Sequence, residues 1–316
     1  MCVPGEARCR MSRKTAQPTV KRVLLGHEIA HFRTALDMKQ TELGKAIGKA
    51  QDTMTNLENG RATITADQLD KLIVKLEITD PADIATLKEF HQDSNKRGEW
   101  TTGHNRVYGE NLRLLIDLER YADLIFVASF EILPGLLQCP SYVRSLISRN
   151  RLARARGISG DQVVKAWEAR QEILAKPDGP LVHFVLSESC LRRMWGPAEV
   201  MYEQMHHLLE VSHRPNVKLQ VLTFDDTATD LSPIGHGFTL LRVPNRGRAG
   251  DLHMAYNEGV KELYYRDDPK ALDAHEEAKA GLVAAARSPE DSRHFIEYIA
   301  NTFQPGVPAL SPTRRS

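Results

Sequence analysis

The sequence lacks any apolar run that approaches the roughly eighteen residues of a membrane-spanning helix. Its first residues are basic and polar and lack the apolar middle region of a signal peptide. Cysteine is also scarce: Cys2, Cys9, Cys139 and Cys190 form no CxxC pair and no metal-site spacing. These absences predict a cytoplasmic protein without a membrane segment, whose cysteines are free thiols.

The common signatures of enzymes are missing as well. The chain contains no GxSxG, no phosphate-binding P-loop and no GxGxxG. Residues 27–31 match HExxH, a zinc-protease motif. A catalytic zinc site also needs a third ligand and a substrate cleft, whereas the apolar Ile29 indicates a helix that packs in a small helical bundle. We interpret that motif as a coincidence. The adjacent His206 and His207 would point in different directions on a helix. We therefore expect no enzyme, no metal and no cofactor.

Charge is distributed unevenly along the 316 residues, although the net charge is only +1. Between Met1 and Ile64 there are eleven Lys and Arg against six Asp and Glu. The rest of the chain must then be net acidic. A basic end on such a protein is the asymmetry expected where one end meets nucleic-acid phosphate.

Composition and periodicity divide the chain into five parts. We predict a disordered basic arm over 1–20, a small all-α domain over 21–91, a polar linker over 92–104, an α+β domain over 105–303 and a disordered tail over 304–316. Met11 is an alternative translation start. The all-α domain has helical spacing over 23–36, 40–47, 51–58, 65–76 and 81–91.

The second domain has mixed patterns. Helices are predicted over 111–121, 142–156, 161–174, 197–213, 270–287 and 289–303, and strands over 181–188, 216–224, 237–243, 251–258 and 261–267. Strands grouped between helices predict an α+β fold. Tyr264 and Tyr265 are consecutive on a strand, so one ring must face outward. Most of the other large aromatic residues should be core: Trp167, Phe184, Trp195, Phe224, Phe238 and Tyr256.

Residues 40–62 have the pattern of two short helices that cross at a steep angle. This geometry requires a small residue in the first helix, and Gly44 takes that position. It also requires a corner residue with a positive φ, which costs little energy only for glycine, and Gly48 takes that position. The inward positions are apolar, as the packing requires: Leu43, Ile47, Met54 and Leu57. The spacing as a whole predicts a helix-turn-helix.

With its Q-x-x-L start and L-E-N-G exit, the segment 23–78 resembles the lambda-repressor/Cro-like (XRE-type) DNA-binding domain. In that family the second helix enters the major groove of an operator. The resemblance implies base-facing roles for Gln51, Asp52, Thr53 and Asn56. It implies phosphate-facing roles for Gln40, Thr55, Asn59 and Arg61. Gln51 is suited to a bidentate hydrogen bond with an adenine edge, and Thr53 is suited to contact with a thymine methyl group.

Two positions depart from that family's pattern. Lys49 stands where an apolar residue is usual, and Ala50 stands where Ser or Thr would cap the recognition helix. The missing cap costs about 0.5–2 kcal/mol. The local helix is thereby weakened, but the pattern is kept.

Most of 105–303 resembles the uncharacterised C-terminal domain that follows XRE-type helix-turn-helices in many actinobacterial regulators. Six segments carry the resemblance: 132–147 (ILPGLLQCPSYVRSLI), 169–174, 186–196, 201–224, 237–241 and 288–296. Regulators of this group resemble antitoxin-like proteins. The resemblance implies a cytoplasmic, nucleoid-associated dimer and gives neither ligand nor mechanism.

Two functions are compatible with these patterns. The first is a DNA-binding transcriptional regulator whose second domain senses a small molecule or a protein partner. The alternative is an antitoxin-like module that sequesters a small protein encoded nearby and autoregulates its operon. Both require double-stranded operator DNA, and an inverted repeat with half-sites about 34 Å apart requires a homodimer.

Overall fold

A computed structural model describes residues 18–94, 107–149, 157–225, 237–258 and 263–304. The chain divides into two compact units near residue 97, and each unit is described by itself. The disordered arm predicted over 1–20 ends earlier than expected, because a helix begins at Val20 with Thr19 as its N-cap. Four predicted segments lie in part outside the described residues: 1–17 of this arm, 95–104 of the linker predicted over 92–104, 150–156 of the helix predicted over 142–156, and 305–316 of the tail predicted over 304–316. Cys2, Cys9 and Met11 also lie outside the described residues.

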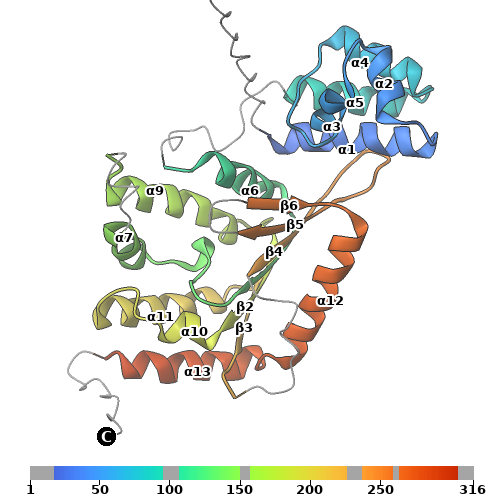
Figure 1. Cartoon of the computed structure of the whole chain (residues 1–316). Coiled ribbons are helices and arrows are strands. Elements are labelled where there is room, and N and C mark those ends of the chain that lie inside the picture. Colours follow the sequence, from blue (N-terminus) through green and yellow to red (C-terminus); the bar gives the residue numbers. More distant parts are fainter. Residues whose placement is uncertain (1–17, 95–106, 150–156, 226–236, 259–262, 305–316) are drawn as a thin grey trace, which may run out of the picture. The chain divides into compact units, whose positions relative to one another are not determined.

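The first unit is a bundle of five helices (Figure 1). They are α1 (Val20–Ala35), α2 (Gln40–Ala46), α3 (Gln51–Glu58), α4 (Ala66–Lys75) and α5 (Pro81–Ser94). Leu43, Met54, Leu69 and Leu72 are almost completely buried between them. Thr65 starts α4 with a capping box shared with Gln68. The last helix runs three residues past its predicted end at His91, so 92–94 are helical rather than linker.

The second unit contains six strands: β1 (Leu124–Ser129), β2 (Leu181–Ser187), β3 (Val217–Leu222), β4 (Phe238–Val243), β5 (Leu252–Glu258) and β6 (Leu263–Arg266). Its longer helices are α6 (Glu110–Tyr121), α7 (Pro140–Arg149), α9 (Gly160–Gln171), α11 (Ala198–Ser212), α12 (Pro269–Ala285) and α13 (Pro289–Thr302). The short ones are η2 (Gly135–Leu137), η3 (Glu172–Leu174) and α10 (Glu188–Arg192).

The strands form one mixed sheet in the order β3-β2-β1-β4-β5-β6. Strands β1, β2 and β3 are parallel, whereas β4, β5 and β6 continue the sheet in antiparallel pairs. The predicted fold class, a helical N-terminal domain followed by a mixed domain of helices and strands, is confirmed. The central strand β1 was not predicted from the sequence.

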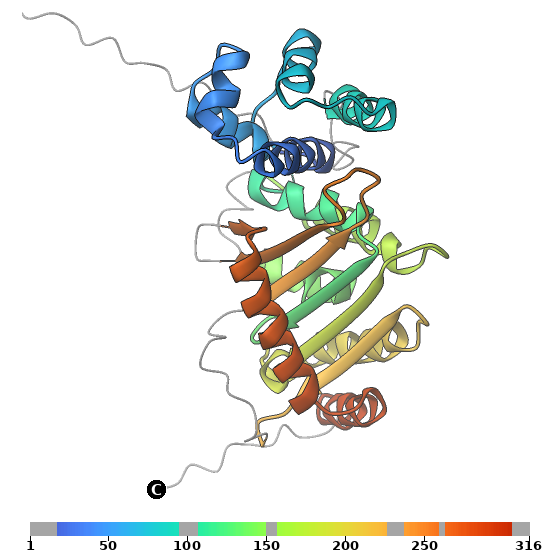
Figure 2. The ribbon, with the colours of Figure 1, turned by 90° about the vertical axis from the view of Figure 1, so that its right-hand side faces the viewer.

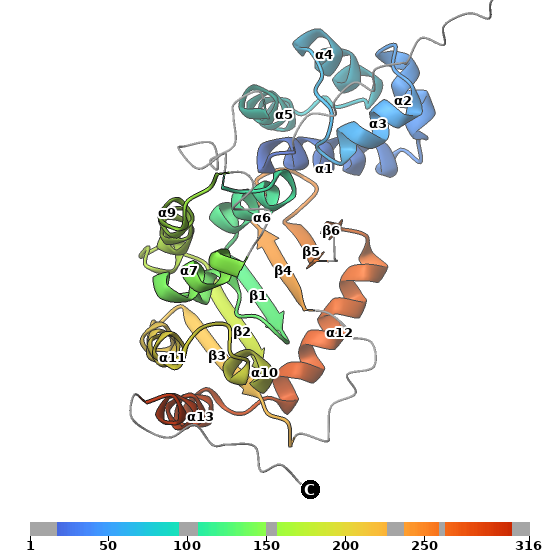
Figure 3. The ribbon, with the colours of Figure 1, turned by 60° about the vertical axis from the view of Figure 1, so that its left-hand side comes forward.

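Helices cover the two faces of this sheet unequally. Figure 2 shows α12 crossing one face alone, and Figure 3 shows α6, α7, α9 and α11 on the opposite side. Under α12 the core is built from Phe126, Val185, Phe238, Leu240 and Leu282. A face covered by a single helix is only partly closed.

The side chains singled out from the sequence lie mostly as expected. Tyr264 is 51% exposed, whereas Tyr265 is half-buried, so one ring of the pair faces outward. Phe184, Phe238 and Tyr256 are core residues, but Phe224 is 65% exposed and its assignment to the core is wrong. It lies two residues beyond the end of β3 at Leu222, outside the sheet. None of the described helices is long and apolar enough to span a bilayer.

Candidate nucleic-acid interface

The corner between α2 and α3 is closed by backbone contacts that only glycine permits. Gly48 has φ of 67°, and the Lys49 amide donates to the Gly44 carbonyl oxygen at 2.8 Å. A Cβ at Gly44 would lie 2.6 Å from the Lys49 carbonyl oxygen, so any side chain there would push the two helices apart. Both predicted glycine roles are confirmed.

Helix α3 buries one side and exposes the other. Met54 and Leu57 are 0% and 2% exposed and fasten the helix to the bundle. Of the predicted base-facing residues, Gln51 and Asp52 are exposed in the first turn, whereas Thr53 and Asn56 are half-buried. Of the predicted phosphate-facing residues, Gln40 is half-buried, and the exposed ones are Thr55, Asn59 and Arg61. The first turn is thus the most accessible part of the helix.

A polar network that the sequence did not reveal fixes α3 against α1 and α2. The Glu58 carboxylate accepts hydrogen bonds from Arg33 Nε at 2.6 Å and from Gln40 Nε2 at 2.7 Å. Gln40 Oε1 in turn accepts from the Thr55 hydroxyl at 2.8 Å. Two of the predicted phosphate-facing residues, Gln40 and Thr55, therefore also position the helix within the protein.

Helix α1 approaches α3 very closely at a second glycine pair. A Cβ at Gly26 would lie 2.5 Å from the Leu57 carbonyl oxygen and nearer still to that of Glu58. Gly60, just after α3, has φ of 68°, and a Cβ there would lie 2.8 Å from a methyl group of Val23. Sequence reasoning missed Gly26, whose signal is a glycine inside an otherwise regular helix.

The start of α3 lacks a side-chain cap, as the sequence predicted. Ala50 occupies the N-cap position in an extended conformation, and its side chain makes no capping hydrogen bond to the first turn. The exposed amide groups of this turn remain available to an outside acceptor. Lys49, the other departure, is half-buried beside the corner.

The alternative sites considered from the sequence have no supporting arrangement in the described parts of the chain. Ile29 is fully buried and His31 is exposed, so the HExxH stretch divides between core and surface. Among the described residues no three potential ligands are grouped to hold a metal ion. Cys139 and Cys190 are buried free thiols, and burial raises the pKa of Cys190 to about 12. Such a thiol stays protonated at neutral pH.

The tight glycine corner and the accessible first turn of α3 are the features of a DNA-binding helix-turn-helix. Residues 29–83 match a family described as Helix-turn-helix, so the first unit is an XRE-type domain of the class found in DNA-binding regulators. Residues 112–298, more than half of the chain, match the Domain of unknown function (DUF5753), and the chain belongs to that family. No curated protein and no solved structure matches the chain.

Proposed function

We propose that this protein is a sequence-specific transcriptional regulator that binds operator DNA as a homodimer through α3. The observation that supports this most directly is the orientation of α3. Met54 and Leu57 hold the helix to the bundle, while Gln51 and Asp52 stand exposed at its start. A helix so held can enter a major groove with its first turn against base edges.

The proposed contacts divide into two kinds. Gln51, Asp52, Thr53 and Asn56 read bases, and Gln40, Thr55, Asn59 and Arg61 meet phosphates. Base contacts give sequence preference, whereas phosphate contacts fix register and are insensitive to sequence. A homodimer places two such helices on an inverted repeat with half-sites about 34 Å apart. The protein would act in the cytoplasm, on nucleoid DNA, as a member of the actinobacterial group that it resembles.

In this proposal the second domain senses a small molecule and changes the affinity of the dimer for DNA. The specific observation in favour is a cavity of about 780 Å³ in that domain. Ligand pockets in proteins have volumes of about 300–1,000 Å³. The antitoxin-like alternative, sequestration of a small protein encoded nearby, instead predicts a stable complex with that protein.

The test is selection of random genomic DNA fragments by the purified full chain at physiological salt. Wild-type protein should enrich an inverted repeat, and Gln51→Ala should lose about 1–3 kcal/mol on the best site and accept more bases at one position. Gln92→Ala, an exposed glutamine on α5, is the matched control and should select as wild type does. Failure of the wild-type protein to enrich any sequence would refute the proposal.

A further inference from the structure

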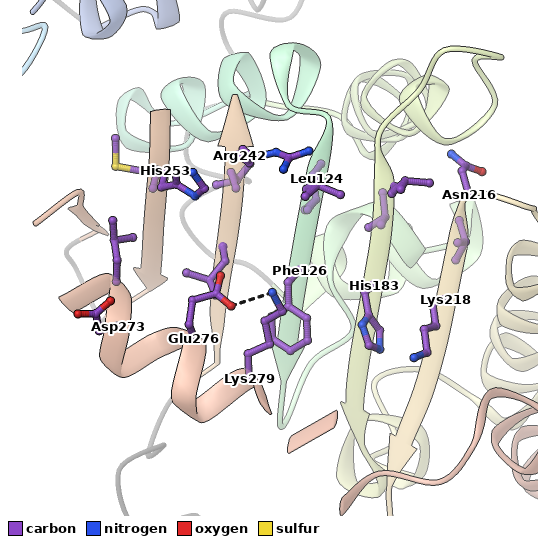
Figure 4. Close-up of a pocket in the computed structure, with 18 of the residues that line it drawn as sticks. Leu124, Phe126, His183, Asn216, Lys218, Arg242, His253, Asp273, Glu276 and Lys279 are labelled. Atoms are coloured by element: carbon purple, nitrogen blue, oxygen red, sulfur yellow. Dashed lines mark hydrogen bonds and ion pairs between the residues drawn. The ribbon is translucent and has the colours of Figure 1, made fainter. Parts of the chain in front are cut away.

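The cavity in the second unit lies between the sheet and α12, on the face that α12 covers only in part (Figure 4). Its floor comes from strands β1 to β5, and its wall comes from Pro269 to Lys279 of α12. All of its lining residues belong to the second unit. The cavity is therefore formed by the second unit alone.

Sheet register explains why the centre of the floor is apolar. Leu124 on β1 pairs with Leu181 on β2, and two residues further along Phe126 pairs with His183. Paired residues, and residues two apart on a strand, point to the same face, so these four side chains lie on the face that α12 covers in part. Leu181 is 59% exposed, which leaves a large apolar side chain open to solvent inside the cavity.

Most of the charged groups around the cavity already have partners. Arg242 donates to Asp123 through Nε at 2.9 Å and Nη2 at 2.7 Å. Lys279 Nζ lies 2.9 Å from the Glu276 carboxylate, a pair drawn in Figure 4. These two cations are neutralised within the protein and are less available to a ligand.

Lys218 differs from those two cations. It is exposed on β3, and within the described ranges no carboxylate lies within ion-pair distance of its ammonium group. It is in register with His183 on β2, so the two side chains are neighbours on the floor. Figure 4 shows this pair at one end of the cavity and Asp273 at the other. One end therefore carries an uncompensated positive charge.

The hydrogen bonds around His183 define what its ring offers to a ligand. Gln220 Nε2 donates to the Arg287 carbonyl oxygen at 2.8 Å, which turns Gln220 Oε1 toward His183 Nε2 at 2.7 Å. That oxygen can only accept, so Nε2 carries the proton and Nδ1 presents a lone pair. Burial lowers the pKa of His183 to about 4, and the ring is neutral at pH 7. In the described part of the chain Nδ1 has no hydrogen-bond partner.

We propose that this cavity binds a small carboxylic acid with an apolar body and a hydroxyl group near the carboxylate. The carboxylate pairs with Lys218 Nζ, the hydroxyl donates to His183 Nδ1, and the apolar body lies on Leu124 and Leu181 beneath α12. A charge-assisted contact next to an apolar surface gives both affinity and orientation. The inference names the ligand of the sensing domain proposed above and rests on that proposal for its regulatory meaning only.

The test is isothermal titration calorimetry of the full chain with decanoate, 3-hydroxydecanoate and decyltrimethylammonium, each below its micellar concentration. We expect decanoate to bind, 3-hydroxydecanoate to bind several-fold more tightly because of one added hydrogen bond, and the cation not to bind. Equal binding of the cation, or no binding of either acid, would overturn the proposal. A 3-hydroxydecanoate no tighter than decanoate would overturn the assignment of the hydroxyl to His183.

Variants then locate the site. Lys218→Gln should weaken acid binding about tenfold, the effect of one hydrogen bond to a charged group. Leu181→Glu should abolish binding, because it places a negative charge on the apolar floor. Both positions are exposed, so the fold should be retained. Lys165→Gln on α9, which does not line the cavity, is the matched control. Unchanged binding by Lys218→Gln would refute the site, and because no DNA is present this failure would leave the DNA-binding proposal intact.

Discussion

Arg33 on α1 and Glu58 at the end of α3 form a two-point contact, with Nε to Oε1 at 2.6 Å and Nη2 to Oε2 at 3.0 Å. Their side chains are only 15% and 9% exposed. Paired hydrogen bonds between a planar guanidinium and a carboxylate fix direction as well as distance. The angle of α3 on the bundle is therefore set by charge as well as by apolar packing.

Removing the carboxylate should destabilise the first domain strongly. Glu58→Ala leaves the Arg33 guanidinium half-buried without its counter-charge, and we expect a loss of about 2–4 kcal/mol in the free energy of unfolding. Chemical denaturation measures the change, with Glu89→Ala, exposed on α5, as the control. The double variant Arg33→Met/Glu58→Leu should lose less free energy of unfolding than the sum of the losses of Arg33→Met and Glu58→Leu measured singly. Strict additivity would show that the pair is not coupled.

A methyl group added at Gly26 should also destabilise the first domain, in this case through a steric clash. The added Cβ would lie 2.5 Å from the Leu57 carbonyl oxygen, a backbone atom that can move only if the helices separate. We expect Gly26→Ala to cost about 1–3 kcal/mol and to speed hydrogen exchange in α1 and α3. Gly281→Ala on α12, where a Cβ would meet nothing within 4 Å, should instead stabilise its helix by about 0.5–1 kcal/mol. Similar effects of the two substitutions would contradict the close approach.

The uncapped start of α3 offers a stabilising substitution. Ala50 is already in the extended conformation of an N-cap residue, so Ala50→Ser supplies the missing acceptor without moving the backbone. We expect the free energy of unfolding to rise by about 0.5–2 kcal/mol. Ala85→Ser, at an exposed position inside α5, should give no gain because serine is a poorer helix former than alanine. Equal changes in melting temperature would argue against the cap.

Arg61 should affect DNA affinity without affecting preference. It is exposed just beyond α3 and is proposed to meet a phosphate. Arg61→Ala should weaken binding to all sequences alike and reduce the slope of log affinity against log salt by about 1. Fluorescence anisotropy over a salt series measures the slope, and Lys75→Ala on α4 is the control. A changed base preference with an unchanged slope would instead place Arg61 on a base edge.

His183 should make the second domain sensitive to mild acid. Folding lowers its pKa from 6.5 to about 4, chiefly through burial and secondarily through the charges of Lys218 and Lys279. The fold therefore favours the neutral ring, and this contribution to stability is complete above pH 6.5 and is lost as pH falls toward 4. The unfolding midpoint of wild type should drop more between pH 7 and pH 4.5 than that of His183→Asn. His294→Asn, exposed on α13, should follow wild type.

The sequence predicted an element correctly where the residues of that element alone form a distinctive pattern. Helix α3 begins at Gln51 and ends at Glu58 as predicted, because the corner glycine and the L-E-N-G exit fix both ends. Strand β1 was not predicted, because its own residues form no distinctive pattern. Its central residues are all buried, so LIFVAS shows no alternation to distinguish a strand from a short apolar stretch of helix.

The side-chain network and the cavity depend on contacts between distant residues. Arg33 and Glu58 are 25 residues apart, and neither belongs to the pattern that identifies the corner. The cavity combines strands β1 to β5 with α12, and β1, the strand that the sequence did not reveal, lies between β2 and β4. Periodicity describes one element at a time, so it gives no information on which faces meet.

The position of β1 in the sheet has a consequence for how the chain is made. β1 is bonded to β4, and the Asp123–Arg242 pair at their ends spans 119 residues. Most of the second domain must therefore be synthesised before β1 can pair with β4. The helical first domain closes over far shorter separations and can fold early in synthesis. During that interval the edge of β1 that later pairs with β4 has no partner strand, and such an edge can pair with another chain and aggregate.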